Sequence, residues 1–275
     1  MSDEQEMLDD ELSEHEEAVE GQMTLFEHLT ELRRRLIYAL IAVAAGCGIS
    51  WTWAEEIFQF ILVPLDRAAP QKGMSTVHYQ SLTEPFFTLL KTSLVAGVFL
   101  AIPVILWQIW KFIAPALYPD EKRLAAPFVL IATLFFFGGG AFCYYVVMPY
   151  GFNFLFIFGD QVAGAKATIM VSEHYALATR LLLAFGAVFE LPVICMFLSA
   201  MGLITHRTLI KYWRVSVVGS FIFAAMLTPP EVITQVAMAV PLILLYGLSI
   251  IVAYFFTVRR EARERAEGLV EDQSP

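Results

Sequence analysis

The sequence predicts an all-α integral membrane protein with six transmembrane helices, and three observations lead to this fold class. Hydrophobic residues make up 58% of the 275 residues and charged residues only 16%, whereas about 25% is typical of soluble domains. Six apolar runs are long enough, or nearly so, to cross the roughly 30 Å hydrocarbon layer of a bilayer. Lysine and arginine are concentrated in alternate connections between these runs, as expected for loops on one side of a membrane.

An acidic tail, residues 1–22, precedes the first apolar run. It holds ten Asp and Glu residues and no Lys or Arg, which accounts for the formal net charge of −9. This composition is typical of a disordered, solvated arm. The tail lacks the basic and apolar regions of a cleaved signal peptide, so we expect the first span to direct the chain into the membrane.

The stretch FEHLTELRRRL, which begins at Phe26, predicts an amphipathic helix that leads into the first span. At 100° per residue, four leucines in and just before this stretch fall within about 60° of arc and form a narrow apolar stripe. They are Leu25, Leu29, Leu32 and Leu36. Glu31 and Arg35 have the i,i+4 spacing of a helical ion pair, which is worth only about 0.2–0.5 kcal/mol. Helical geometry alone therefore leaves Glu31 open between a weak surface ion pair and an acid that binds a ligand.

The membrane domain is expected to cover residues 23–257, followed by a charged C-terminal tail at 258–275. The six spans are predicted at about 36–54, 85–110, 125–149, 174–201, 213–228 and 232–257. The two longer connections on the outer side, about 55–84 and 150–173, are predicted as loops. The fifth span has only 13 uncharged residues after Arg214, about 20 Å of helix, so its basic residues reach outward or the bilayer thins around it.

The distribution of basic residues orients the chain with both termini in the cytoplasm. Thirteen of the 18 Lys and Arg residues lie on the side of the termini, three lie in the outer loops, and two lie within spans. Cytoplasmic loops carry the excess of Lys and Arg in membrane proteins. An even number of spans agrees with this arrangement, because it returns the chain to the side on which it began.

Three ionisable residues fall within the predicted spans, and such residues cost about 2.5–3.5 kcal/mol near the bilayer centre. Lys91 and Arg180 lie roughly 9 Å from the outer ends of their helices, so their side chains can reach the interface. Glu190 lies about 24 Å from the outer end of the fourth helix, and Pro192 follows it with an expected bend. Glu190 is either a neutral, hydrogen-bonded acid between helices or a contact for a substrate or a partner helix.

The sequence lacks the residues that several classes of function need. The three cysteines lie in apolar runs without CxxC spacing, which argues against a zinc site or a disulfide framework. The five histidines lie in tails, in loops or at span ends, so an intramembrane protease would lack a base within the membrane, and no GxxxxGK[ST] phosphate loop is present. We expect a protein that is not an enzyme, with no metal, no cofactor and no nucleic-acid partner.

A second acid, Glu121, lies in the first cytoplasmic loop within the basic sequence YPDEKR. Guanidinium groups pair with carboxylates through two parallel hydrogen bonds. Glu31 and Glu121 on the same face of the membrane could therefore together receive a ligand with two basic groups.

Four motifs, in this order, resemble those of the TatC family, the receptor and core subunit of the twin-arginine protein translocase. They are HLTELRRRL from His28, FIAPALYPDEKR from Phe112, FGAVFELPV from Phe185 and LTPPEVITQ from Leu227. The resemblance covers about residues 23–257. It implies a cupped six-helix protein in a bacterial or archaeal cytoplasmic membrane, which binds the twin-arginine signal peptides of folded precursors and uses the protonmotive force.

The resemblance also assigns residues to roles. It places Glu31, Glu121, Arg33, Arg35 and Phe112 in signal-peptide binding. It places Glu190, with Gln235 and Glu231, in polar contacts with single-span TatA-like and TatB-like subunits of an oligomeric complex. Pro64 matches a position in the first outer loop that is important for function. Glu231 stands where many members have aspartate, which leaves its role less defined.

One alternative from another functional class stays open, a proton-coupled secondary solute transporter that uses Glu190 as its proton carrier. It is motivated by the acid within the membrane and by a faint repeat at an offset of 89 residues, which pairs Pro103 with Pro192 and Lys91 with Arg180. The second and fourth spans run in the same direction, as in the parallel repeats of some transporters.

Overall fold

The computed structural model describes residues 25–69, 77–113, 125–163, 168–227 and 232–266, which are helical over most of their length. Four helices or continuous helix pairs are long and apolar enough to cross a membrane: Glu84–Ile113, Pro127–Gly159, Val171–Ala200 and Met238–Val258. A bent pair, His28–Trp51 with Ala54–Ala68, passes the same test as a unit, and Trp213–Leu227 is a shorter apolar helix. These six segments correspond in order to the six predicted spans. The acidic tail and the end of the C-terminal tail lie outside the described residues.

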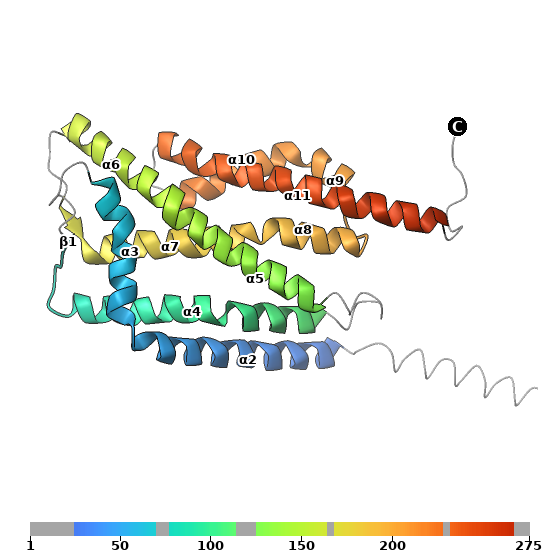
Figure 1. Ribbon diagram of the computed structural model, residues 1–275, viewed down its shortest axis with the longest axis horizontal. Helices are drawn as coiled ribbons and strands as arrows, with labels where there is room; N and C mark the ends of the chain where they lie inside the picture. Colours follow the sequence, from blue (N-terminus) through green and yellow to red (C-terminus); the bar gives the residue numbers. More distant parts are fainter. Residues whose placement is uncertain (1–24, 70–76, 114–124, 164–167, 228–231, 267–275) are drawn as a thin grey trace, which may run out of the picture.

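The first helix, α2 (Leu25–Trp51), runs antiparallel to α4 (Glu84–Ile113) at one edge of the molecule (Figure 1). Their backbones touch at a pair of glycines. A Cβ atom added to Gly46 would lie 2.6 Å from the Gly97 carbonyl oxygen, and one added to Gly97 would lie 2.5 Å from the Cys47 nitrogen. Small residues allow such close approach between helices in a membrane. This contact fixes the register of α2 against α4.

The chain turns sharply after α2 into α3 (Ala54–Ala68), which is bent by 88° relative to α2. The predicted outer loop at 55–84 thus begins with a helix that contains Pro64. The apolar sequence FQFILVPL lets this helix bury one side, and its buried residues include Ile61, Pro64 and Leu65. After α3, the strand β1 (Val77–His78) pairs in parallel with β2 (Ile169–Met170).

The third span is a single rod with a widened turn in the middle. It is built from α5 (Ala125–Phe142), the π-helical turn η3 (Cys143–Val147) and α6 (Met148–Ala163). The rod continues well past residue 149, so much of the predicted loop at 150–173 is helical. Its apolar sequence FNFLFIF, from Phe152, explains this extension, because α6 packs its Phe152 and Phe156 into the protein core.

The fourth span is broken at Glu190, between α7 (Val171–Phe189) and α8 (Leu191–Ala200). Pro192 lies at the start of α8, where a proline needs no backbone donor. The short α9 (His206–Lys211) leads into α10 (Trp213–Leu227), and α11 (Val232–Ala266) completes the described chain. Helix α10 has 15 residues, about 22 Å, which is shorter than the hydrocarbon layer.

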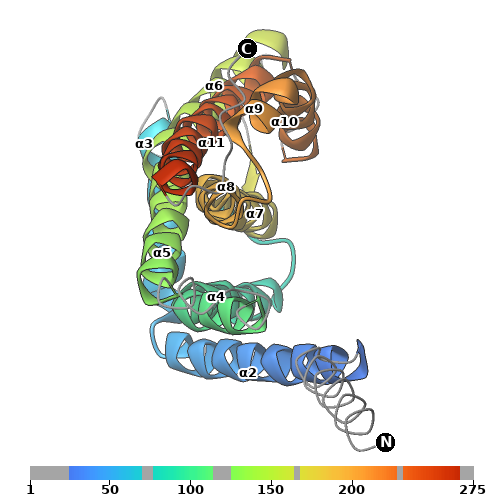
Figure 2. The same cartoon turned by 90° about the vertical axis from the view of Figure 1, so that its right-hand side faces the viewer.

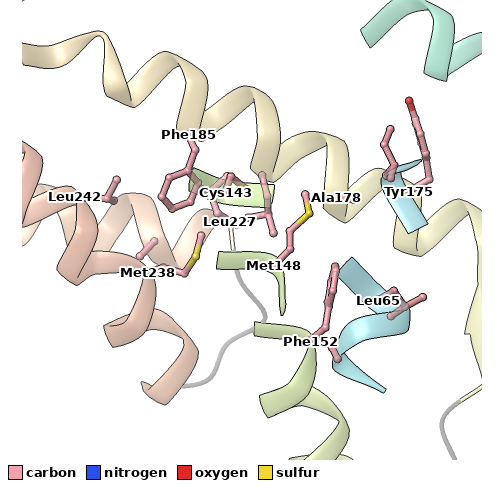
Figure 3. Packing of buried hydrophobic residues seen from close by; sticks show 14 of the residues in the cluster. Leu65, Cys143, Met148, Phe152, Tyr175, Ala178, Phe185, Leu227, Met238 and Leu242 are labelled. Atoms are coloured by element: carbon pink, nitrogen blue, oxygen red, sulfur yellow. The ribbon is translucent and has the colours of Figure 1, made fainter. Parts of the chain in front are cut away.

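The buried core lies between α3, η3, α6, α7, α10 and α11 (Figure 3). Its labelled members include Met148, Phe152, Tyr175, Phe185 and Met238. Among the described residues, neither α2 nor α4 contributes to this cluster. Figure 2 shows the helices arranged along an arc, with α2 at one end and α10 near the other. Helix α2 is therefore held chiefly by its seam with α4.

We call the two ends of the bundle the basic end and the cap end. The basic end carries the start of α2, the end of α4 and α9, with Arg33, Arg34, Arg35, Lys111, Arg207 and Lys211. The cap end carries α3, β1 and β2 (Figure 1). At the cap end, the Glu84 carboxylate accepts a hydrogen bond from the backbone N–H of Ser172 at 2.8 Å, which ties the start of α4 to the start of α7.

Candidate functional site

The candidate site at the basic end is built around an ion pair on α2. The Arg35 guanidinium donates from Nη2 to Glu31 Oε1 at 2.8 Å, one helical turn away. The two side chains are only 23% and 16% exposed, respectively. At 100° per residue, Arg35 and Glu31 project within about 20° and 60° of Gly46, which touches α4. The predicted i,i+4 pair therefore forms on the side of α2 that faces α4 rather than on an open surface.

The pair leaves two polar atoms unused. Glu31 Oε2 and Arg35 Nε are buried and have no hydrogen-bond partner among the residues that the structure describes. A buried acceptor without a partner costs about 1–3 kcal/mol. Glu31 therefore has a free acceptor that a further donor could satisfy.

Aromatic rings close the seam next to this pair. The His28 imidazole stacks on the Phe112 ring with 4.4 Å between centroids and 25° between planes. This contact joins the first turns of α2 to the last turn of α4 and brings Phe112 to the Glu31 side of the helix pair. Arg33 lies in the same turns of α2 but is exposed.

Two of the acids predicted for function cannot be placed. Glu121 falls within 114–124 and Glu231 within 228–231, and both ranges lie outside the described residues. The expected meeting of Glu31 and Glu121 at one binding site thus stays a prediction.

Glu190 lies at the break between α7 and α8, deep within the fourth span. It is 9% exposed, and its Oε1 is buried without a partner in the described part of the chain. An acid in this position is expensive in a membrane unless another polar group or a proton compensates it. Within the described ranges Glu190 has no salt bridge that would assign it to packing alone.

Gln235 joins the last two helices at the cap end. Its side-chain Nε2 donates to the Phe221 carbonyl at 3.0 Å, which links α11 to α10. This hydrogen bond holds the short α10 against α11.

Pro64 has a structural partner that the sequence did not reveal. A proline within a helix removes the donor for the carbonyl four residues earlier, here Phe60. The Tyr144 hydroxyl donates to that carbonyl at 2.8 Å, and the Tyr144 ring stacks on the Phe60 ring with 4.3 Å between centroids. Pro64 thereby creates the acceptor by which α3 is fastened to the π-helical turn η3.

No three His, Cys, Asp or Glu side chains within the described ranges lie close enough together to hold a metal ion. The chemistry that this arrangement offers is recognition by charge, hydrogen bonding and stacking.

Comparison with known proteins identifies the family. The family model described as Sec-independent protein translocase protein (TatC) matches residues 27–241. The chain is 41% identical over 238 residues to the TatC protein of Desulforapulum autotrophicum, which covers 86% of this chain and 87% of that protein. The chain belongs to the TatC family. The TatC protein of Aquifex aeolicus is 38% identical over 244 residues, which cover 89% of this chain and all of that protein.

Solved structures agree with this membership. A crystal structure of the twin arginine translocase receptor TatC superposes with a TM-score of 0.75 at 38% identity, over 84% of this chain and 100% of that one. The predicted fold class, an all-α membrane protein with six spans, is thereby confirmed. The chain is a multi-pass membrane protein and a core component of the twin-arginine translocase, not an enzyme. TatC membership does not favour the secondary-transporter alternative.

Proposed function

We propose that this TatC protein is the receptor for the twin-arginine motif of signal peptides and that Glu31 binds one of the two arginines. The observation that carries the proposal is the state of the Glu31 carboxylate. It is mostly buried, its Oε1 is held only by Arg35, and its Oε2 has no partner among the described residues.

The interaction free energies favour the binding of a signal-peptide arginine to Glu31 over the internal pair of Glu31 with Arg35. An i,i+4 ion pair on a helix contributes about 0.2–0.5 kcal/mol. Hydrogen bonds to charged groups are worth about 1.5–3 kcal/mol each, and a guanidinium can make two to one carboxylate. A signal-peptide arginine can therefore engage Glu31 at little cost, either displacing Arg35 or using the free oxygen beside it.

The remaining recognition residues complete the proposal. Glu121 takes the second arginine, and Phe112, stacked on His28, offers an apolar wall to the peptide. Arg35 holds the Glu31 carboxylate in the seam until a peptide arrives, and the exposed Arg33 adds to the cytoplasmic basic cluster. Both termini face the cytoplasm of a bacterial or archaeal cell, and the membrane is the cytoplasmic membrane.

The intramembrane residues serve the assembly of the translocase. Glu190 contacts the single transmembrane helices of TatA-like and TatB-like partners, a role supported by its buried Oε1, which has no hydrogen-bond partner among the described residues. Gln235, which ties α11 to α10, and Glu231, which directly precedes α11 in the sequence, contribute further polar groups to these contacts. The protonmotive force drives export, in line with the absence of a nucleotide-binding loop in the sequence.

Site-specific crosslinking tests the receptor role. A twin-arginine signal peptide is crosslinked to membranes that contain the wild-type chain, Glu31→Gln, Glu121→Ala or the control Glu173→Gln. Glu173 is an exposed acid at the start of α7, at the cap end. We expect crosslinking to be lost in the first two variants and kept in the control, with equal membrane insertion throughout. Unchanged crosslinking in both Glu31→Gln and Glu121→Ala would overturn the proposal.

A further inference from the structure

The seam between α2 and α4 contains a third polar group that the sequence did not single out, the side-chain amide of Gln108. Its Oε1 is buried and has no hydrogen-bond partner among the described residues, as is true of Glu31 Oε2 and Arg35 Nε. Gln108 lies on α4 one turn before Phe112. Three unsatisfied polar atoms thus belong to neighbouring turns of the two helices that form the candidate site.

The glycine contact places Gln108 opposite Arg35. Arg35 precedes Gly46 by eleven residues on α2, and Gln108 follows Gly97 by eleven residues on the antiparallel α4. Eleven residues are about three turns and roughly 16.5 Å, and they return the side chain to within about 20° of the same face. Both residues are therefore displaced equally toward the basic end from the point where the helices touch.

Two further contacts agree with this placement. The stack of His28 on Phe112 shows that α2 and α4 still face each other one turn beyond Gln108. Trp110 packs on the opposite side of α4, where its ring lies 5.1 Å from that of Phe128 and 5.0 Å from that of Phe197. Because positions 108 and 110 project about 200° apart on a helix, Gln108 faces α2.

We propose that Gln108 is a specificity-determining residue of the peptide site, where its carbonyl oxygen and Glu31 Oε2 together receive one arginine and disfavour lysine. This inference rests on the proposed receptor function. A guanidinium has five donors in a planar fork, so it can satisfy both acceptors at once. An ammonium is a compact and strongly hydrated charge, which makes its transfer into the closed seam more costly.

The different contributions of Glu31 and Gln108 to binding follow from their charge. Glu31 attracts either cation, because its carboxylate interacts with any positive group. Gln108 is neutral, so it contributes a directed hydrogen bond rather than net charge. Removing Gln108 should therefore cost an arginine peptide much more than a lysine peptide.

Equilibrium binding to the full chain in lipid nanodiscs tests the inference. The probes are a signal peptide with paired arginines and the same peptide with paired lysines. The chains are wild type, Gln108→Leu, Gln108→Glu, Glu31→Gln and the control Gln59→Leu, whose side chain is exposed on α3. We expect Gln108→Leu to weaken arginine-peptide binding about tenfold or more and to change lysine-peptide binding much less, so that the preference collapses.

Gln108→Glu separates a specificity role from a structural one. It adds a carboxylate at the same place, so we expect it to strengthen lysine-peptide binding, which mere disruption of the seam would not do. An unchanged preference in both Gln108 variants, with the Glu31→Gln loss intact, would overturn the inference and leave the receptor function standing. No preference for arginine in the wild-type chain would instead overturn the receptor function itself.

Discussion

Replacing Tyr144 with phenylalanine should destabilise the protein, because it leaves a backbone carbonyl of α3 without a hydrogen-bond donor. The Tyr144 hydroxyl donates to the Phe60 carbonyl at 2.8 Å, and Pro64 has no N–H with which to bond that carbonyl along α3. Phenylalanine keeps the ring that stacks on Phe60 and removes only the hydroxyl. The carbonyl is then left unsatisfied, at a cost of about 1–3 kcal/mol.

The dependence on Pro64 gives this prediction a second, sharper form. In a Pro64→Ala background the alanine N–H can bond the Phe60 carbonyl within α3, as in an ordinary helix. Tyr144→Phe should then cost less than about 0.5 kcal/mol, because the carbonyl no longer depends on Tyr144 alone. The double-mutant cycle should therefore show a coupling of about 1–2 kcal/mol.

Thermal unfolding of the four chains in detergent measures this coupling. A change of 1 kcal/mol shifts the Tm of a soluble domain of comparable size by about 2–4 °C, which sets the scale of the expected shifts. Tyr145→Phe serves as the control, since Tyr145 is the next residue and is 57% exposed. If Tyr144→Phe lowers the Tm equally in the wild-type and Pro64→Ala backgrounds, the hydroxyl does not act through the Phe60 carbonyl that Pro64 leaves without a donor.

Three further predictions follow from contacts elsewhere in the chain. Gly46→Ala should lower the Tm by several degrees, because its Cβ would lie 2.6 Å from the Gly97 carbonyl oxygen, whereas Gly48→Ala, with nothing within 4 Å of the new Cβ, should leave it unchanged within about 1 °C. Equal Tm values would contradict the close seam. Glu190→Gln should weaken co-purification of the single-span partners more than crosslinking of a signal peptide, because the buried acid lies at the break between α7 and α8 and not in the seam of α2 and α4 that holds Glu31; the reverse order would place it in the recognition site. Gln235→Leu should lower the Tm by removing the 3.0 Å hydrogen bond to Phe221, and an unchanged melting curve would argue against that link between α10 and α11.

The spans could be predicted from the sequence because their signal is a long apolar run, which depends little on tertiary contacts. Helix α3 could not be predicted, since it is short, contains Pro64 and begins with Glu55 and Glu56. Its packing into the core against α6 and α7 stabilises it as a helix. The extension of α6 beyond residue 149 was not predicted, because it depends on the packing of Phe152 and Phe156 into the core, which an apolar run alone does not show.

The candidate site could be predicted in part. The i,i+4 spacing of Glu31 and Arg35 gave the ion pair, which the structure contains. Its burial against α4 depends on the Gly46–Gly97 contact, and a single sequence does not specify which glycines meet. Gln108 and Tyr144 were missed for the same reason, since their importance comes from partners on other helices. The signal available in the sequence was their position, with Gln108 one turn before Phe112 and Tyr144 within an otherwise apolar span.

The central claim is that this chain reads the paired arginines of a signal peptide with Glu31, and one measurement tests it most directly. The affinity of the full chain in lipid nanodiscs is compared for a twin-arginine signal peptide and its twin-lysine counterpart, with wild type and Glu31→Gln. We predict that wild type binds the arginine peptide at least about tenfold more tightly than the lysine peptide and that Glu31→Gln loses this binding. Equal affinity of wild type for the two peptides, or undiminished arginine-peptide binding by Glu31→Gln, would contradict the claim.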